Sequence, residues 1–193
     1  MTFRLILILA VFTSLSACAS GARTGAMTAP VSSTTIISES SSLRKSITVA
    51  EVSGGKETNP LWASNVGNTE FRAALEQSLM LHALHEAATP RYKLEANLIK
   101  IDQPFVGFDM TVGARVSYRL ATVDTNERVY EREVQCEYTA ALSDAFLGYE
   151  RLRLANEGAI KKNISIFIEG LIAEFVKRDA AAVAATTSEA TGG

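Results

Sequence analysis

The stretch Met110–Leu120, MTVGARVSYRL, alternates apolar and polar residues along its whole length. Its apolar members are Met110, Val112, Ala114, Val116, Tyr118 and Leu120. Because successive side chains of a strand point to opposite faces, this period of two places the apolar residues on one face. The stretch therefore predicts a β-strand with one face on a core and the other in water, as is typical of antiparallel sheets.

Three neighbouring segments share this alternation and predict three further strands. They are Ile47–Val52, Tyr92–Leu98 and Val134–Tyr138. Asp124–Glu127 supplies turn residues before the last of them. The polar face carries charges of both signs, which predicts a solvated surface with cross-strand pairs. The charged residues expected on that face are Lys93, Glu95, Arg115, Arg119, Glu133 and Glu137.

Two longer segments have helical periodicity. The first runs from about Thr69 to Ala87 and stops before Pro90, which disfavours helix in the residue that precedes it. The second runs from about Gly148 to Val176 and contains two further glycines, Gly158 and Gly170. A glycine inside a helix costs about 1 kcal/mol relative to alanine. Close packing against the sheet or a kink would each account for these two residues.

The predicted order of elements is strand, helix, three strands, helix. This order favours a two-layer α+β fold. Two amphipathic helices would pack on one face of a roughly four-stranded, mostly antiparallel sheet. Residues 47–178 have a suitable length for a single domain of this kind. The pairing of the first strand stays open, because a helical crossover follows it.

The N-terminus has the pattern of an exported protein. Arg4 precedes the apolar run Leu5–Phe12, which is too short for a membrane-spanning helix of about 20 residues. Leu15-Ser16-Ala17-Cys18 then resembles the bacterial lipobox. This resemblance implies a lipoprotein signal peptide over 1–17 and a diacylglycerol, with acyl chains such as palmitate, on the thiol of Cys18. An ordinary secretory signal followed by a chance cysteine is the alternative.

Two stretches of low complexity flank the predicted domain. Residues 18–46 are rich in Ser, Thr, Ala and Gly and hold no aromatic residue. Such a composition buries too little apolar surface to offset the entropy of ordering, so we expect a lipidated flexible tether. Residues 179–193 have a similar composition and predict a disordered C-terminal tail.

Charge and cysteine content narrow the function further. The formal net charge is −2, and removal of the signal peptide takes away one basic residue, Arg4. Nucleic-acid binding calls for a clustered basic surface, so we expect no nucleic-acid partner. Cys136 is the one cysteine left besides Cys18. A buried thiol is the favoured interpretation, and a reactive or intermolecular thiol is the alternative.

Candidate catalytic and metal-binding residues are few. His82, His85 and Glu86 would share one side of a helix and could hold zinc, although a partly buried histidine at a helix end is the favoured interpretation. No sequence pattern of nucleophile, base and orienting acid occurs. We therefore expect no enzyme activity, no metal and no cofactor. Carboxylates without a fixed spacing are Asp102, Asp109, Asp144 and Glu150.

Aromatic residues occur where polar loops are expected. The sequence DQPFVGFD, Asp102–Asp109, joins two predicted strands, and a second apolar cluster precedes the last helix. Exposed apolar patches often mark binding surfaces, which predicts a contact site for a partner protein or a lipid. The alternative is that these side chains close the end of the core. The candidate contact residues are Phe105, Val106, Phe108, Phe146 and Tyr149.

The order of these segments resembles a group of small bacterial envelope lipoproteins. The strand Ile47–Val52 and the helix NTEFRAALEQSL are similar to the opening of the LptE-like lipopolysaccharide-assembly lipoproteins and the YajG-like lipoproteins. The strands YKLEANLIKID and MTVGARVSYRL are similar to their central hairpin. The resemblance covers about 46–175 and is one of pattern. It implies a non-enzymatic accessory or assembly subunit at the outer membrane.

Two functional hypotheses follow for a chain tethered to a membrane through Cys18. The first is a scaffold or assembly subunit of an envelope complex of the lipopolysaccharide-transport or export type, whose protein partners are unknown. The second is a module that binds a lipid or glycan in an apolar pocket of several hundred Å³. Ala19 after the cysteine favours the outer membrane, facing the periplasm, and the inner membrane is the other location.

Overall fold

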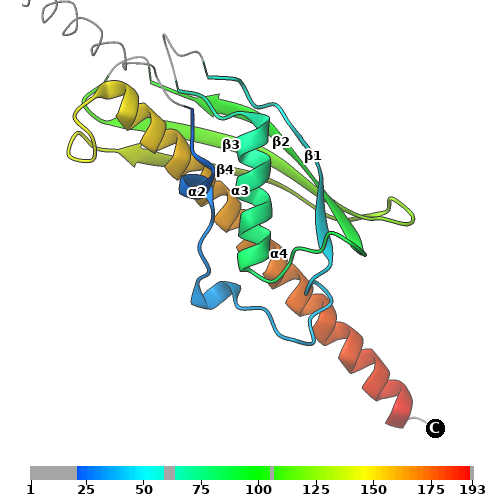
Figure 1. The fold of residues 1–193 in the computed structure, drawn as a ribbon. Helices are drawn as coiled ribbons and strands as arrows, with labels where there is room; N and C mark the ends of the chain where they lie inside the picture. The colour runs from blue at the N-terminus through cyan, green and yellow to red at the C-terminus, as the bar shows by residue number, and fades with distance from the viewer. Residues whose placement is uncertain (1–20, 59–63, 105–106, 192–193) are drawn as a thin grey trace, which may run out of the picture.

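The computed structural model describes residues 21–58, 64–104 and 107–191, with side chains through residue 185. It confirms the predicted α+β class, with a four-stranded sheet and a helical layer (Figure 1). The elements in chain order are α2 (Thr24–Met27), η2 (Ser33–Thr35), β1 (Ile47–Ser53), α3 (Asn68–Leu81), β2 (Tyr92–Asp102), β3 (Met110–Thr122), β4 (Arg128–Ala140) and α4 (Gly148–Thr191).

The strand order in the sheet is β1-β2-β3-β4, which is the order of the strands in the sequence. β1 pairs with β2 in parallel, and the other two pairs are antiparallel. The sequence did not predict which strand β1 pairs with. In the structure β1 pairs only with β2 and lies at one edge of the sheet. Since parallel neighbours need a crossover connection, α3 lies between β1 and β2 in the chain.

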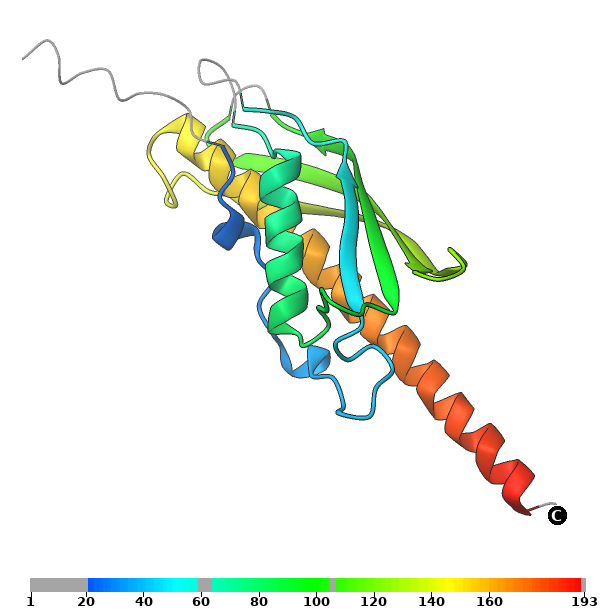
Figure 2. The same cartoon turned by 45° about the vertical axis from the view of Figure 1, so that its right-hand side comes forward.

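Both long helices cover the same face of the sheet. α3 lies along β1, and α4 crosses β3 and β4 (Figure 2). The alternating residues that decided the fold are buried in this layer, where the ring of Tyr118 stacks on Phe167 with centroids 4.0 Å apart. The largest fully buried side chains are Tyr118, Phe71, Phe167, Met27, Leu43, Ile47, Leu75, Leu79, Leu84, Leu94, Leu120 and Ile160.

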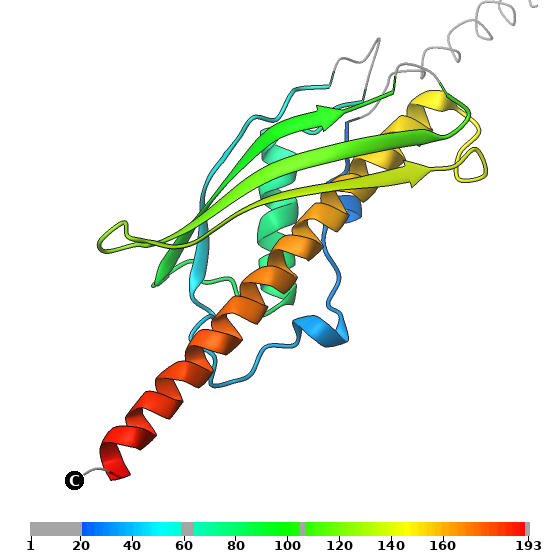
Figure 3. The same ribbon diagram turned by 180° about the vertical axis from the view of Figure 1, so that it is seen from behind.

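The opposite face of the sheet is open and polar (Figure 3). Arg119 on β3 pairs with Glu95 on β2 at 2.9 Å, and Arg115 pairs with Glu133 on β4 at 3.5 Å. These contacts confirm the predicted cross-strand pairs. Exposed pairs of this kind contribute between 0 and about 1 kcal/mol, so they keep the face soluble more than they stabilise it.

The segment before β1 packs against the domain, which corrects the expectation of a flexible tether over 18–46 for its described residues, 21–46. From residue 21 it forms α2 and η2 and runs beside the helical layer (Figure 2). The backbone amide of Ala29 donates to the Ser78 hydroxyl of α3 at 2.9 Å. A few well-spaced apolar side chains offset the entropy of ordering the segment. Those that are buried are Ala22, Met27, Ala29 and Leu43.

The last helix continues far beyond the core, which corrects the expectation of a disordered tail over 179–193 for residues 179–191. α4 extends to Thr191 in a single helix. Extending an existing helix needs no new nucleus, and alanine, which dominates residues 180–185, has the highest helix propensity. The side chains of 180–185 are exposed, so burial contributes little to the stability of this part of α4.

The first long helix is shorter than predicted. α3 ends at Leu81 instead of near Ala87. Ala83 has a φ of 55°, in the left-handed region, and the amide of Leu84 returns to the Leu79 carbonyl at 2.9 Å. This closing turn lets Leu84 enter the core, where it is fully buried. Packing of one leucine therefore ends the helix early.

The two glycines inside α4 lie where β4 crosses the helix. A Cβ atom on Gly158 would come within 2.3 Å of the Tyr138 ring. A Cβ on Gly170 would collide with the guanidinium group of Arg132. Close packing therefore accounts for Gly158, whereas at Gly170 the contact is with the end of a flexible arginine side chain, which can move aside. Among the described residues, no helix has the length and apolar content that crossing a membrane requires.

Candidate functional site

The predicted contact residues that the structure describes lie in two loops at one end of the sheet. Phe108, before β3, is 82% exposed, and Phe146, before α4, is 87% exposed. Tyr149 in the first turn of α4 is partly exposed. Cys18, Phe105 and Val106 lie outside the described residues. The alternative interpretation was that these side chains close the end of the core. The exposure of Phe108 and Phe146 contradicts it.

Arg151 joins these two loops. Its Nη1 donates to the carbonyl oxygens of Ala145 and Phe146, each at 2.7 Å, and its Nη2 lies 3.4 Å from the Gly107 carbonyl. Arg151 is buried, so its charge is solvated by these backbone dipoles instead of by water. Both loops are thus held as one unit, with Phe146 on its outside.

Two carboxylates complete this unit. Asp109 Oδ1 accepts the backbone N–H of Leu142 at 3.0 Å, which links the loops a second time. Asp144 Oδ2 accepts the N–H of Ala141 at 2.8 Å. Both carboxylates therefore serve the loop backbones. We call the exposed apolar surface of these loops the loop-tip patch; it consists of Phe108, Leu142, Phe146, Leu147 and Tyr149.

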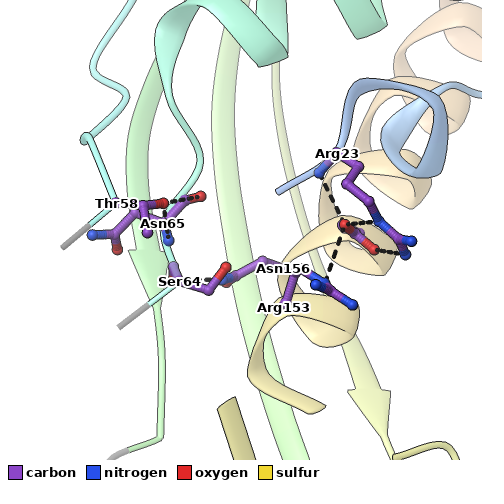
Figure 4. A network of polar contacts seen from close by, with 7 residues as sticks. Arg23, Thr58, Ser64, Asn65, Arg153 and Asn156 are labelled. Atoms are coloured by element: carbon purple, nitrogen blue, oxygen red, sulfur yellow. Dashed lines mark hydrogen bonds and ion pairs between the residues drawn. The ribbon is translucent and has the colours of Figure 1, made fainter. Parts of the chain in front are cut away.

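A polar network, the N-terminal latch, fixes the first described residues to α4 (Figure 4). Glu157 accepts three bonds from Arg23: from the backbone N–H at 2.9 Å, from Nε at 2.9 Å and from Nη2 at 3.0 Å. Arg153 Nε lies 3.8 Å from the same carboxylate. The Glu157 side chain is 3% exposed. Hydrogen bonding to this carboxylate raises the pKa of the Arg23 guanidinium.

The loop before α3 ties the latch to the sheet (Figure 4). The N–H of Ala22 donates to the carbonyl of Asn65 at 3.2 Å. The neighbouring carbonyl of Ser64 accepts the amide of Asn156 on α4 at 2.8 Å and that of Gln103, just after β2, at 2.9 Å. The N-terminal segment, the loop before α3, the end of β2 and the start of α4 therefore meet at one end of the molecule.

Sequence reasoning identified the aromatic loops but missed Arg151 and the latch. Two signals were present. Arg23 is the one charged residue between Cys18 and Glu39. Arg151 is a cation in the first turn of a helix, where the helix dipole favours anions. A charge in an unfavourable or isolated position is thus a useful indication of a specific partner.

Cys136 is a buried thiol, which confirms the favoured interpretation. Its Sγ donates to the Ala159 carbonyl of α4 at 3.4 Å. Burial raises the pKa of this thiol, so the reactive thiolate is disfavoured. Next to it, the buried amide of Asn163 donates to Val134 at 2.9 Å and accepts the Tyr118 hydroxyl at 2.9 Å. These contacts hold α4 in register with the sheet.

The residues considered for zinc do not share a helix, because α3 ends before them. The Nδ1 of His82 lies 2.6 Å from the Ser78 carbonyl, and His82 is buried. The Glu86 carboxylate accepts the Ala88 N–H, which lowers its pKa. No group of three His, Cys, Asp or Glu residues suited to a metal ion occurs in the part of the chain that the structure describes.

The surface hollows are small or charged. One of about 230 Å³ lies between β2 and the loop that contains Lys56, and one of about 270 Å³ lies on the open sheet face around Arg115. A wider hollow of about 470 Å³ is lined by charged residues that include Arg128 and Glu174. The layer between sheet and helices is filled by the packed core.

No protein-family model matches the sequence, and no curated protein matches it. Among solved structures, protein XCC0632 from Xanthomonas campestris, assigned to family DUF330, is similar with a TM-score of 0.53 at 9% identity, over 80% of this chain and 98% of that chain. A candidate lipoprotein from Caulobacter crescentus CB15 has a TM-score of 0.46 at 14% identity, over 71% and 92% of the two chains. A minor lipoprotein from Acinetobacter baumannii has a TM-score of 0.35 at 6% identity, over 69% and 95%.

The first of these likenesses shows a shared fold with a bacterial protein, and the two weaker ones are with proteins named as lipoproteins. A shared fold does not transfer an activity. The candidate site therefore rests on this chain's own residues: the loop-tip patch and the N-terminal latch.

Proposed function

We propose that this chain is a membrane-anchored lipoprotein of the bacterial envelope that acts as a non-enzymatic scaffold or assembly subunit. The observation that carries the proposal is the lipobox-like sequence Leu15–Cys18 followed, five residues after Cys18, by the latch at Arg23. An acyl group on Cys18 would thus be connected to a rigid domain by a very short linker. Such a connection suits a protein whose task is to hold a fixed position.

Four described residues of catalytic types, Asp109, Asp144, Cys136 and His82, have structural contacts, which supports a function in binding instead of catalysis. The carboxylates of Asp109 and Asp144 accept loop amides. The Cys136 thiol is buried, and His82 closes a helix end. A general acid or nucleophile needs an accessible, suitably tuned group.

The finer part of the proposal concerns the complex and the membrane. We propose an envelope machine of the lipopolysaccharide-transport or export type, with the protein anchored in the outer membrane and facing the periplasm. The second candidate, a lipid- or glycan-binding module, has less support. Ligand pockets usually enclose about 300–1,000 Å³ of largely apolar space. The hollows beside β2 and on the open sheet face measure about 230 and 270 Å³. Two hollows of about 340 and 470 Å³ reach that size, but each has several charged residues in its lining, such as Glu157 and Lys161 in the first and Arg128 and Glu174 in the second.

The anchor is tested by Cys18→Ser in the full chain expressed with its own N-terminus. We expect loss of the acylated N-terminal peptide in mass spectra and transfer of the protein from the membrane fraction to the soluble fraction. Two or three acyl chains hold a protein firmly, while a protein without them is held only by its own surface. Cys136→Ser is the matched control, and this variant should stay acylated and membrane-bound.

The scaffold is tested by crosslinking in intact cells followed by identification of the bound proteins. We expect the same envelope proteins to be captured with the parent chain and with Cys136→Ser, and to be lost with Cys18→Ser. Equal membrane association of Cys18→Ser and the parent chain would overturn the anchor. A lipid or glycan that co-purifies in native mass spectra, without any crosslinked protein, would favour the second candidate.

A further inference from the structure

We propose that the loop-tip patch rests on the surface of the same bilayer that holds the N-terminal anchor, so that α4 points away from the membrane. This inference rests on the proposed acylation of Cys18. It adds a second contact with lipid, made by the folded domain itself, and it assigns the domain an orientation.

The first step is the length of the linker. A fully extended chain spans at most about 3.3–3.6 Å per residue, so the Cα of Cys18 lies within about 11 Å of that of Gly21. Ala22 is bonded to Asn65 and Arg23 to Glu157, so the chain is fixed to the domain immediately after Gly21. A domain so connected cannot stand far from the membrane surface, in contrast to one on the expected tether of 18–46.

The second step identifies the end of the domain that faces the membrane. The first described residues lie at the end of the molecule where α4 begins, as two views of the fold agree (Figures 1 and 2). Glu157 of the latch lies nine positions after Gly148, which is about 14 Å along the helix. Gln103, bonded to the loop beside the latch, lies in the same loop as Phe108. The anchor and the loop-tip patch therefore share one end.

The third step is the chemistry of that end. Phe108 and Phe146 are the most exposed aromatic residues in the part of the chain that the structure describes. Aromatic rings favour the boundary between headgroups and acyl chains. The nearby residues Asp109 and Asp144 are exposed, but each carboxylate accepts a backbone amide within the loops, so that bond offsets part of its charge. The contact would be apolar, and we expect it to change little with salt or with anionic lipid.

The orientation is tested by placing the photo-crosslinking residue p-benzoylphenylalanine at single positions of the full, acylated chain in its membrane. Phe108 and Phe146 are the test positions. Met80, near the far end of α3, and Val183, on the projecting part of α4, are control positions that are also exposed. After irradiation, we expect phospholipid adducts at the two test positions in several-fold excess over the two controls. Each variant is first checked for the parent thermal transition.

Three results would overturn the orientation. They are equal lipid adducts at all four positions, adducts at the controls instead, and crosslinks from Phe108 and Phe146 to a protein in place of lipid. All three are informative while the chain remains acylated. Failure of the proposed function gives a different result, because the N-terminal peptide would then carry no acyl group in the parent chain.

A longer linker tests the physical cause. Insertion of about 20 Gly and Ser residues between Ala19 and Ser20 leaves the latch and the patch unchanged but releases the domain from the short connection. The effective concentration of the patch at the bilayer surface then falls as the linker becomes longer. We expect the lipid adducts at Phe108 to drop several-fold while acylation stays complete. Unchanged adducts would show that the linker does not hold the patch on the bilayer.

Discussion

The two stretches of small residues that flank the domain have opposite structures. Residues 21–46 run along the helical layer with several side chains buried, whereas residues 180–191 continue α4 into solvent. Both stretches are rich in small residues, which are mainly Ser, Thr and Ala in the first and Ala and Thr in the second. From composition alone, both stretches are predicted to be disordered.

The difference lies in a few large or charged residues. The N-terminal stretch contains Met27 and Leu43, which are fully buried, and Arg23, which meets a buried carboxylate. The described side chains of the C-terminal stretch are alanines and Val183, all exposed. Helix propensity can order such a stretch locally, but only burial and specific pairing order it against the rest of the molecule.

The largest expected effect contrasts Leu43→Ala with Val183→Ala. Leu43 is fully buried, so its truncation removes apolar contacts and leaves a cavity. We expect a loss of about 3 kcal/mol in the free energy of unfolding, measured with urea. Val183→Ala should change this free energy by less than about 0.5 kcal/mol, because the side chain is 65% exposed. Equal losses in both variants would contradict the contrast.

A smaller effect is expected when the latch is opened by Glu157→Gln. Arg23 and Arg153 lose their common negative partner, which leaves buried polar groups poorly compensated. We expect a loss of about 2 kcal/mol, below the range for fully buried pairs because the Arg23 side chain is 58% exposed. Limited proteolysis should become faster within residues 21–46.

The matched control for the latch is Glu174→Gln on the same helix. Glu174 pairs with Arg178 at 3.0 Å, but the side chain of Glu174 is 38% exposed, whereas that of Glu157 is 3% exposed. Such a pair contributes about 0.3–0.5 kcal/mol, so proteolysis of residues 21–46 should stay at the parent rate. If Glu157→Gln also kept the parent rate, the latch would not be what orders the N-terminal segment.

The smallest effect concerns Asp179, a residue of α4 that bonds to the N-terminal stretch. Its carboxylate accepts the Ser42 hydroxyl at 2.7 Å and the Ser42 amide at 3.2 Å, and the hydroxyl bond is the main cause that lowers the pKa of Asp179. A lowered pKa stabilises the fold at pH values above the usual aspartate pKa of about 3.9. This contribution is lost as the pH falls through the folded value.

The measurement is an NMR titration of the Ser42 amide. The chemical shift of this amide should follow the protonation of Asp179, with a midpoint pH below the usual aspartate pKa. Asp179→Asn should abolish this transition and lower the free energy of unfolding by less than about 1 kcal/mol. Removal of residues 186–193 retains Asp179 inside the helix and should leave the midpoint unchanged. A midpoint at or above the usual aspartate value would contradict the bond to Ser42.

The strands and the two-layer architecture could be predicted because their signal is local. Alternation along Met110–Leu120 survives in the structure residue by residue, with Val112 and Leu120 fully buried. The end of α3 could not be predicted in the same way. It depends on Leu84 reaching the core through a left-handed Ala83, and this is a tertiary requirement that the helical pattern does not contain.

The aromatic loops could be predicted as a surface because Phe108 and Phe146 occupy positions where turns are normally polar. The parts that support them could not. Arg151 acts through backbone carbonyls of two loops, and Arg23 acts through Glu157. The contacts of Arg151 give no sequence pattern, because any residue can supply a backbone carbonyl. The contact between Arg23 and Glu157 gives none either, because the two residues are far apart in the sequence.

The distance between the latch partners has a consequence for the order of events during folding. Arg23 and Glu157 are 134 residues apart in the chain. The antiparallel strands β2, β3 and β4 are joined by short loops, so they can pair while the rest of the chain is still open. Closing the long loop from Arg23 to Glu157 costs more entropy and requires α4 to be present. The first described residues are therefore among the last to pack against the domain. In a nascent chain that stops before α4, this N-terminal segment stays unpacked and accessible to proteases.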